Sequence, residues 1–208
     1  MAKRKPRHPR TGRGWDLPDN ALAHTLREFL DWSGAHAISP KTIRQRQRAC
    51  RRFIVWAETR GLSKPSEITL PILERYQQHL YHYRKTDGQP LTFGSQYTEL
   101  VPLKAYFKWA TRSRHILYNP AAELTMPKVM PSLSGYVLSV ADVEAILNAT
   151  DVTTSLGIRD RAILEVLYSS AIRRSELLHL AVFDVDTRRG SLLVRDGKGA
   201  KDRLVPLG

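Results

Sequence analysis

Residues 159–180 read Arg-Asp-Arg-Ala-Ile-Leu-Glu-Val-Leu-Tyr-Ser-Ser-Ala-Ile-Arg-Arg-Ser-Glu-Leu-Leu-His-Leu. Apolar residues recur in this stretch at helical spacing, which predicts one helix over 158–169 and another over 173–180. Beyond it the pattern changes to strands, at 191–195 and 203–207, on either side of a Gly-Lys-Gly turn. Two short apolar runs around a glycine-rich turn predict a β-hairpin. The second half of the chain is therefore expected to contain helices followed by a hairpin.

The rest of the chain reads as helical. A short helix is predicted over about 140–149, where Ser139 and Asp142 approximate a capping box. Pro102 is expected to kink or split the helix that contains it. The other predicted helices cover about 20–33, 40–61, 66 or 69 to 84, and 94–113. We expect a basic disordered arm at 1–17, a helical domain at 18–125, a linker at 126–137 and a second domain at 138–208.

Composition favours a soluble, cytoplasmic protein. Hydrophobic residues make up 42% of the 208, enough for a buried core. No apolar run approaches the roughly 18 residues that a membrane helix needs. Cys50 is the single cysteine, which excludes an internal disulfide framework and a cysteine-rich zinc site. His79 and His82 lack further candidate ligands nearby, so no metal site is predicted.

The charge of the chain is strongly positive and unevenly distributed. The net charge is +13. Residues 1–14 contribute +6, residues 15–130 contribute +7, and residues 131–208 contribute zero. So basic a protein usually meets a polyanion, most often nucleic acid. The front two thirds are therefore expected to supply most of the electrostatic attraction to DNA.

One predicted helix concentrates this charge. On a helical wheel for residues 41–57, apolar side chains fill one sector and cations fill a nearly opposite one. No acid interrupts the run before Glu58, whereas a merely solvated face normally mixes both signs. We expect this face to contact DNA. A weaker basic stripe, with cations at four-residue spacing, is present in the helix over 94–113. The predicted DNA-contacting residues of the two helices are Lys41, Arg44, Arg48, Arg51, Arg52, Lys104 and Lys108.

Four segments resemble the tyrosine recombinase or phage integrase family, which includes the Xer-type recombinases. Residues 170–177, Ser-Ala-Ile-Arg-Arg-Ser-Glu-Leu, resemble its first catalytic box, except that Ala171 stands where the family usually has glycine. Residues 196–208 resemble the family's hairpin with its catalytic lysine, and Lys198 follows Arg173 by 25 residues. Residues 38–44 and 119–122 resemble landmarks of the family's core-binding domain. The resemblance covers the chain from about residue 20 to its end.

The resemblance implies a mainly α fold. It consists of an N-terminal helical, SAM-like core-binding domain followed by the start of an α+β catalytic domain that ends in a β-hairpin. The implied function is site-specific DNA recombination or integration, in which a tyrosine attacks a phosphodiester and forms a 3′-phosphotyrosine. The implied partners are double-stranded DNA and other recombinase subunits, and the implied location is nucleoid-associated. The family needs neither metal nor nucleotide cofactor, because the covalent intermediate keeps the bond energy.

The resemblance also assigns roles to individual residues. Arg173 is expected to stabilise the charge of the transition state through its planar, permanently charged fork. Lys198 is expected to donate a proton to the leaving 5′ oxygen. Glu176, one turn after Arg173, is expected to orient that arginine. Lys201, in the same hairpin, is assigned to DNA contact.

The family's second catalytic box, His-x-x-Arg followed by the nucleophilic tyrosine, lies after the lysine hairpin. The eight tyrosines all precede the hairpin, at positions 76, 81, 83, 97, 106, 118, 136 and 168. We therefore expect a truncated recombinase that binds DNA but is inactive alone and leaves apolar surface uncovered. A truncated gene product, a partial sequence and a decayed integrase all fit. The competing interpretation is a DNA-binding regulator without recombinase descent.

Overall fold

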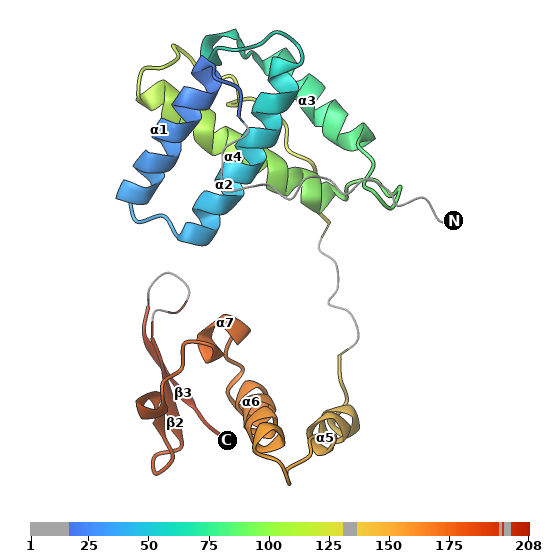
Figure 1. The fold of residues 1–208 in the computed structure, drawn as a ribbon, viewed down its shortest axis with the longest axis vertical. Coiled ribbons are helices and arrows are strands. Elements are labelled where there is room, and N and C mark those ends of the chain that lie inside the picture. Colours follow the sequence, from blue (N-terminus) through green and yellow to red (C-terminus); the bar gives the residue numbers. More distant parts are fainter. Residues whose placement is uncertain (1–16, 131–136, 196, 198–200) are drawn as a thin grey trace, which may run out of the picture. The chain divides into compact units, whose positions relative to one another are not determined.

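The protein forms two compact units, residues 1–131 and 132–208 (Figure 1). The computed structural model describes residues 17–130, 137–195, 197 and 201–208. The division falls within the stretch predicted as a linker. Nearly all of the predicted basic arm, and also Lys198, lie outside the described residues.

Four long helices build the first unit, close to the predicted positions. They are α1 (Ala21–Ala35), α2 (Pro40–Glu58), α3 (Leu70–His82) and α4 (Phe93–Arg112), with a short 3-10 helix, η1 (Pro65–Glu67), before α3. Side-chain caps set several of the starts. Asn20 accepts a hydrogen bond from the amide of Ala23, and Ser39 accepts one from the amide of Thr42, directly before Pro40. These residue types satisfy amides that a helix start leaves unpaired.

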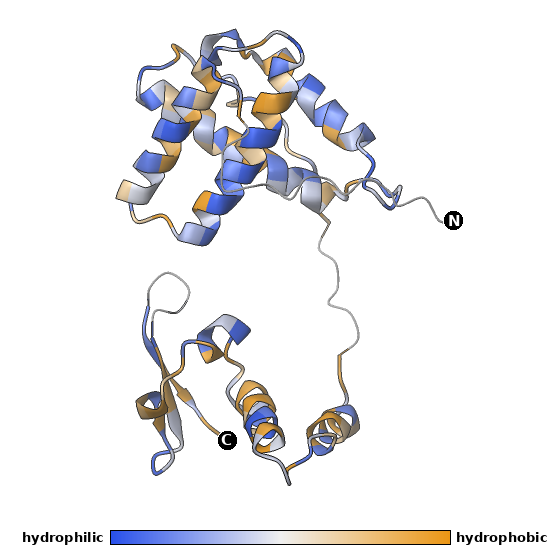
Figure 2. Ribbon diagram, in the orientation of Figure 1, coloured by the Kyte–Doolittle hydropathy of each residue, from blue (hydrophilic) through white to orange (hydrophobic). Residues whose placement is uncertain are grey.

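One hydrophobic core holds the four helices together. Helix α2 packs against α1 and α4, and α3 packs against α4. The turns of α1 and α2 alternate between hydrophobic and hydrophilic in Figure 2, as expected of helices that bury one side. The largest fully buried side chains are Phe29, Phe53, Tyr76, Tyr106 and Phe107. Their burial positions the basic side of α2 outward.

Helix α4 continues through Pro102 as one element, so of the two predicted outcomes, a kink or a split, the split does not occur. Proline removes one backbone hydrogen bond, which destabilises a helix interior. Here Pro102 is buried, and Leu100, Leu103 and Phe107 around it are 0% exposed. Core packing on both sides of the proline offsets the lost bond, which local propensity does not reveal.

The second unit combines short helices with a small antiparallel sheet. Its elements are α5 (Val140–Asn148), α6 (Ser155–Ser170), α7 (Arg174–Leu177), the 3-10 helix η2 (Val182–Asp184), β1 (Val185–Asp186), β2 (Ser191–Val194) and β3 (Arg203–Pro206). The strand order is β1-β2-β3, with Leu192 opposite both Val185 and Val205. The predicted hairpin is confirmed as β2 and β3. Strand β1 was not predicted, because two residues are too few to show an alternation.

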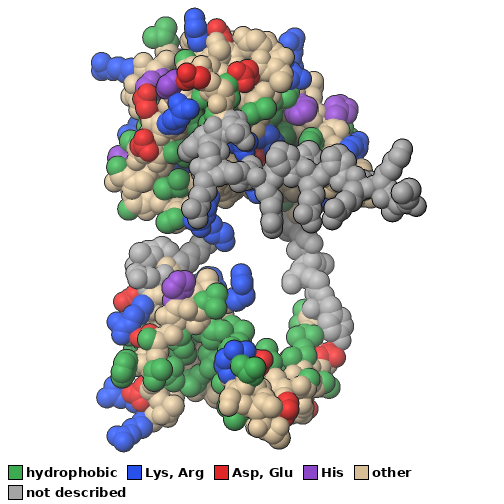
Figure 3. Space-filling view, in the orientation of Figure 1, with side chains coloured by type: hydrophobic (Ala, Val, Ile, Leu, Met, Phe, Trp, Pro, Cys, Tyr) green, Lys and Arg blue, Asp and Glu red, His purple; other side chains and the backbone are tan. Residues whose placement is uncertain are grey.

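The core of the second unit is small, and much of its apolar surface is uncovered. Ile172, Leu192 and Val194 are its buried centre. By contrast, Phe183 is 95% exposed and Val182 is 85% exposed. Hydrophobic side chains gather at the surface of this unit in Figure 3. Apolar surface is therefore left uncovered, as the sequence predicts. Within the described ranges, no helix is both long and apolar enough to cross a membrane.

Candidate functional site

A left-handed residue forms the turn that presents Arg173. Helix α6 ends at Ser170, and Ala171 follows with φ 51°, in the left-handed region. This conformation reverses the chain, after which Ile172 is buried and Arg173 is exposed. A residue with a side chain is strained in this region, whereas glycine is not. The alanine at this position therefore carries strain that glycine would relieve.

The Glu176 carboxylate binds both the backbone amide and the side chain of Arg173. Its Oε2 accepts the Arg173 amide at 2.8 Å, and its Oε1 accepts Arg173 Nη1 at 2.9 Å. The Glu176 side chain is 6% exposed, while that of Arg173 is 57% exposed. Glu176 thus occupies the place expected of a residue that orients Arg173 and leaves it open to solvent. The catalytic roles of both residues stay predictions.

A second arginine, Arg203 on β3, shares this carboxylate. Its Nη1 donates to Glu176 Oε1 at 3.0 Å, and its Nη2 donates to Oε2 at 2.7 Å. The hydrogen bonds from Arg203, followed by that from the Arg173 amide, lower the pKa of Glu176 to about 2. Glu176 therefore remains ionised at neutral pH, and two arginines against one carboxylate leave an excess positive charge.

Both ends of the loop between β2 and β3 are tied to neighbouring turns. Arg203 binds Glu176 at one end, and Arg195 Nε donates to Asp184 Oδ1 at 2.6 Å at the other. Between them, the Gly197 amide donates to the Lys201 carbonyl at 3.1 Å. These contacts hold the described residues on either side of Lys198 in the sequence.

An open cavity of about 630 Å³ lies beside this cluster. It is lined by Ala171, Arg173, Lys201, Asp202 and Arg203. The structure thus brings Arg173 and Lys201, which are far apart in sequence, to one cavity. Guanidinium and ammonium groups around an open cavity suit a phosphate oxygen.

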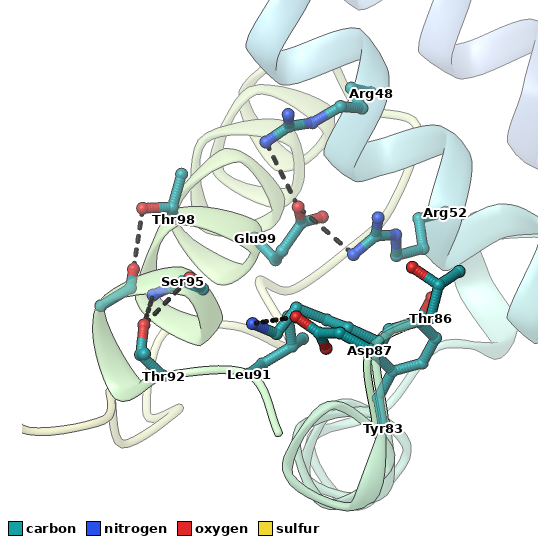
Figure 4. Close-up of a pocket in the computed structure, with 12 residues that line it drawn as sticks. Arg48, Arg52, Tyr83, Thr86, Asp87, Leu91, Thr92, Ser95, Thr98 and Glu99 are labelled. Atoms are coloured by element: carbon teal, nitrogen blue, oxygen red, sulfur yellow. Dashed lines mark hydrogen bonds and ion pairs between the residues drawn. The ribbon is translucent and has the colours of Figure 1, made fainter. Parts of the chain in front are cut away.

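The predicted basic side of α2 is present in the first unit. Lys41, Arg44 and Arg48 are exposed, and Arg51 and Arg52 are half-buried. Arg48 Nη2 and Arg52 Nη1 each lie 3.4 Å from Oε1 of Glu99, on α4 (Figure 4). Two of the five predicted DNA contacts therefore form an internal ion-pair network.

The two lysines predicted on α4 differ in their surroundings. Lys108 is exposed. Lys104 Nζ donates to the carbonyls of Leu124 at 3.1 Å and Ala122 at 3.4 Å, which holds the segment after α4 against the helix. A contact between Lys104 and DNA stays a prediction. The observed contacts of its ammonium group are the two backbone carbonyls.

Sequence reasoning did not single out Glu99, Arg203, Asp184 or Arg195. Only Glu99 carries a signal, because it lies four residues before the apolar Leu103 and seven before Tyr106, which places it on the expected buried stripe. The other three depend on contacts between elements. Among the described residues, no group of three or more His, Cys, Asp or Glu side chains could hold a metal ion.

Comparisons with known proteins identify the family. The family model described as "Phage integrase family" matches residues 136–208. The "Tyrosine recombinase XerC 2" of Ralstonia nicotianae is 56% identical over 98% of this chain and 59% of its own length. The "Tyrosine recombinase XerC" of Oceanobacillus iheyensis is 30% identical over 82% of this chain and 53% of its own length. The chain thus spans less than two thirds of these relatives.

The fold is also that of a solved family structure. A lambda integrase dimer bound to a COC' core site superposes with a TM-score of 0.63, at 19% identity, covering 89% of this chain and 62% of that one. The TM-score shows a shared fold, and at this identity the likeness concerns the fold alone. The resemblance inferred from the sequence is confirmed by the 56% identity to the Ralstonia protein. The chain therefore belongs to the phage integrase family of tyrosine recombinases and is Xer-like within that family.

Proposed function

We propose that this chain binds double-stranded DNA and carries the first part of the active site of a site-specific DNA recombinase. The observation that carries the proposal is the Arg173 cluster, in which a buried carboxylate holds an exposed arginine beside an open, basic cavity. The basic side of α2 supports DNA binding. So does the lambda integrase relative in fold, which is bound to DNA.

In the proposed mechanism, Arg173 stabilises charge on the scissile phosphate. One of its side-chain N–H groups is bound to Glu176, and the exposed remainder of the fork is available to phosphate oxygens. Because Arg203 already binds Glu176 through two N–H groups, the carboxylate does not neutralise Arg173 alone. A preorganised cation of this kind stabilises developing negative charge without reorganising during the reaction.

Lys198 is proposed to protonate the leaving 5′ oxygen. Its loop is bounded by the Arg195–Asp184 and Arg203–Glu176 pairs. A general acid must come within hydrogen-bonding distance of the oxygen that it protonates. Arg195 and Arg203, which these pairs hold, lie three and five residues from Lys198 in the sequence.

We further propose that the polypeptide of residues 1–208 does not cleave DNA by itself. The proposed chemistry requires a tyrosine nucleophile and a second arginine box after the hairpin, and the last tyrosine of these 208 residues is Tyr168. Other recombinase subunits are the proposed protein partners, because a lambda integrase neighbour in fold is a tetramer bound to a Holliday junction.

The test is incubation of the chain with a nicked suicide DNA duplex, followed by denaturing electrophoresis. We expect a mobility shift under native conditions and no covalent protein–DNA adduct. The Ralstonia relative serves as the positive control for adduct formation. An adduct formed by residues 1–208 would sink the claim of inactivity, and failure to bind any duplex would sink the proposed function.

The competing interpretation, a DNA-binding regulator without recombinase descent, is contradicted by the 56% identity to a tyrosine recombinase.

A further inference from the structure

A buried carboxylate lies behind the basic side of α2. Glu99 is on α4, and its side chain is 6% exposed. Its Oε1 faces Arg48 and Arg52, which are one turn apart on α2 (Figure 4). Its Oε2 is buried and has no hydrogen-bond partner among the described residues. A carboxylate with this little contact to water is unfavourable unless nearby positive charge compensates it.

This contact restrains Arg48 and Arg52 without using all of their N–H donors. Each approaches Glu99 Oε1 through one terminal nitrogen at 3.4 Å, and their side chains remain 64% and 39% exposed. The Arg52 guanidinium also lies 5.7 Å from the centre of the Tyr83 ring, which restricts it further. Both guanidinium groups therefore keep N–H donors directed away from Glu99.

These arginines line an open cavity of about 610 Å³ between α2 and the start of α4. Lys85 and the hydroxyl side chains of Thr92, Ser95 and Thr98 also line it. Two acids lie there too, and Asp87 is paired with Lys85 at 3.6 Å. Three cations against two carboxylates leave a net charge of +1 at this cavity. The Thr98 hydroxyl already donates to the Gly94 carbonyl, and the Thr92 and Ser95 hydroxyls bond to each other. The cavity thus offers a phosphate group mainly excess positive charge and the N–H donors of its cations.

Without Glu99, the two guanidinium groups would repel each other and spread apart. An arginine side chain loses about 2 kcal/mol of rotamer entropy when it is fixed. Preorganising the pair before DNA arrives removes part of that loss from the binding step. The same carboxylate that lowers the local positive charge would therefore strengthen phosphate binding.

We propose that Glu99 is a positioning residue of the DNA interface, which holds Arg48 and Arg52 so that together they bind one backbone phosphate. This inference rests on the proposed function, because it needs the chain to bind duplex DNA. It predicts that removing a negative charge from this DNA-binding surface weakens DNA binding, which is the opposite of the effect of charge alone.

The experiment measures the affinity of the 208-residue chain for a fluorescein-labelled duplex by fluorescence anisotropy. Glu99→Gln removes the charge and keeps the shape of the side chain. We expect affinity to fall by about tenfold, because two arginines must now be ordered during binding. A simple charge effect predicts tighter binding instead. Glu123→Gln, at an exposed acid of the same unit, is the matched control and is expected to leave affinity unchanged or to raise it.

A double-substitution comparison separates positioning from general damage. In an Arg48→Gln/Arg52→Gln background, Glu99→Gln is expected to cause no further loss of affinity, because the side chains that it positions are gone. If Glu99→Gln does not fold, Arg48→Lys/Arg52→Lys replaces it, with an expected loss of about tenfold at constant charge. Unchanged or tighter binding by Glu99→Gln, or by the lysine variant, overturns the inference while the proposed function stands. Absence of duplex binding by the unsubstituted chain overturns both.

Discussion

At the scale of single residues, Ala171 and Glu176 together present Arg173. Ala171 supplies the left-handed turn, and Glu176 binds the arginine that emerges from it. Ala171 acts through backbone strain, whereas Glu176 acts through electrostatic attraction. The strain is therefore tested by the stability of a glycine variant, and the attraction is tested by the pH dependence of stability.

Ala171→Gly is expected to stabilise the second unit by about 0.5–1 kcal/mol. The left-handed conformation destabilises a residue with a side chain by about 1–2 kcal/mol, and the extra entropy that glycine loses on folding offsets part of the gain. Hydrogen exchange of the β2 amides measures the change. Ala162→Gly, inside α6, is the control and is expected to destabilise by about 1 kcal/mol. Equal destabilisation by both substitutions would contradict the strain at Ala171.

Glu176 is expected to make the stability of the second unit depend on acid pH. Its pKa is lowered from 4.5 to about 2 in the folded protein, chiefly by Arg203. A carboxyl group with a depressed pKa stabilises the fold fully above its unfolded pKa. That contribution is then lost as pH falls from about 4.5 toward 2.

The measurement is the unfolding free energy between neutral pH and pH values near the folded pKa, for the unsubstituted chain and for Glu176→Gln. The difference between the two curves is expected to shrink as pH falls. Subtraction removes the contribution of Asp184, whose pKa is also lowered, first by the Ala181 amide and then by Arg195. Parallel curves across this range would show that Glu176 is not the group responsible.

At the scale of elements, the basic side of α2 has two parts with different surroundings. Near its start, Lys41 and Arg44 are exposed. Further along, Arg48 and Arg52 face Glu99. The first part is expected to contribute by charge alone, whereas the second depends on geometry.

Arg44→Gln is expected to weaken duplex binding and to reduce the slope of log affinity against log salt by about 0.9, the value for one lost phosphate contact. Anisotropy titrations across a range of salt concentrations measure both quantities. Arg75→Gln is the matched control, since Arg75 is an exposed arginine on α3 rather than on α2. An equal change of slope in the two variants would mean that DNA does not bind preferentially to the basic side of α2.

At the scale of the whole molecule, charge and candidate chemistry occupy different units. Residues 1–130 carry a net charge of +13, while residues 131–208 carry none. The Arg173 cluster belongs to the second unit, and the Glu99 cluster belongs to the first. Each unit has its own buried hydrophobic cluster.

A polypeptide of residues 1–130 is expected to keep duplex affinity within about tenfold of the complete chain, because neutralising phosphate charge dominates non-specific binding. The same anisotropy assay applies, and residues 131–208 provide the complementary fragment, for which much weaker binding is expected. Circular dichroism verifies that the first fragment is helical. Strong binding by the second fragment alone would contradict the division of roles.

Much of the fold could be predicted because helix and strand periodicities are local. The starts at Asn20, Ser39 and Ser139 follow from capping chemistry, and every predicted helix ends within about three residues of its observed end. Two other features differ from what local patterns indicate, and they have a common cause. Pro102 does not divide α4, and β1 exists, because tertiary packing and strand pairing outweigh local propensity.

The sequence by itself determined the helical front unit, the helix-to-hairpin order of the second unit, the charge gradient and the family. These depend on residue order and spacing, which the chain displays directly. Only the tertiary structure decided that Glu99 faces Arg48 and Arg52, and that Arg203 shares Glu176 with Arg173. These contacts join residues on different elements, up to 51 positions apart for Arg48 and Glu99. Ion pairs of this kind require the packed core to bring the elements together, and no local pattern specifies them.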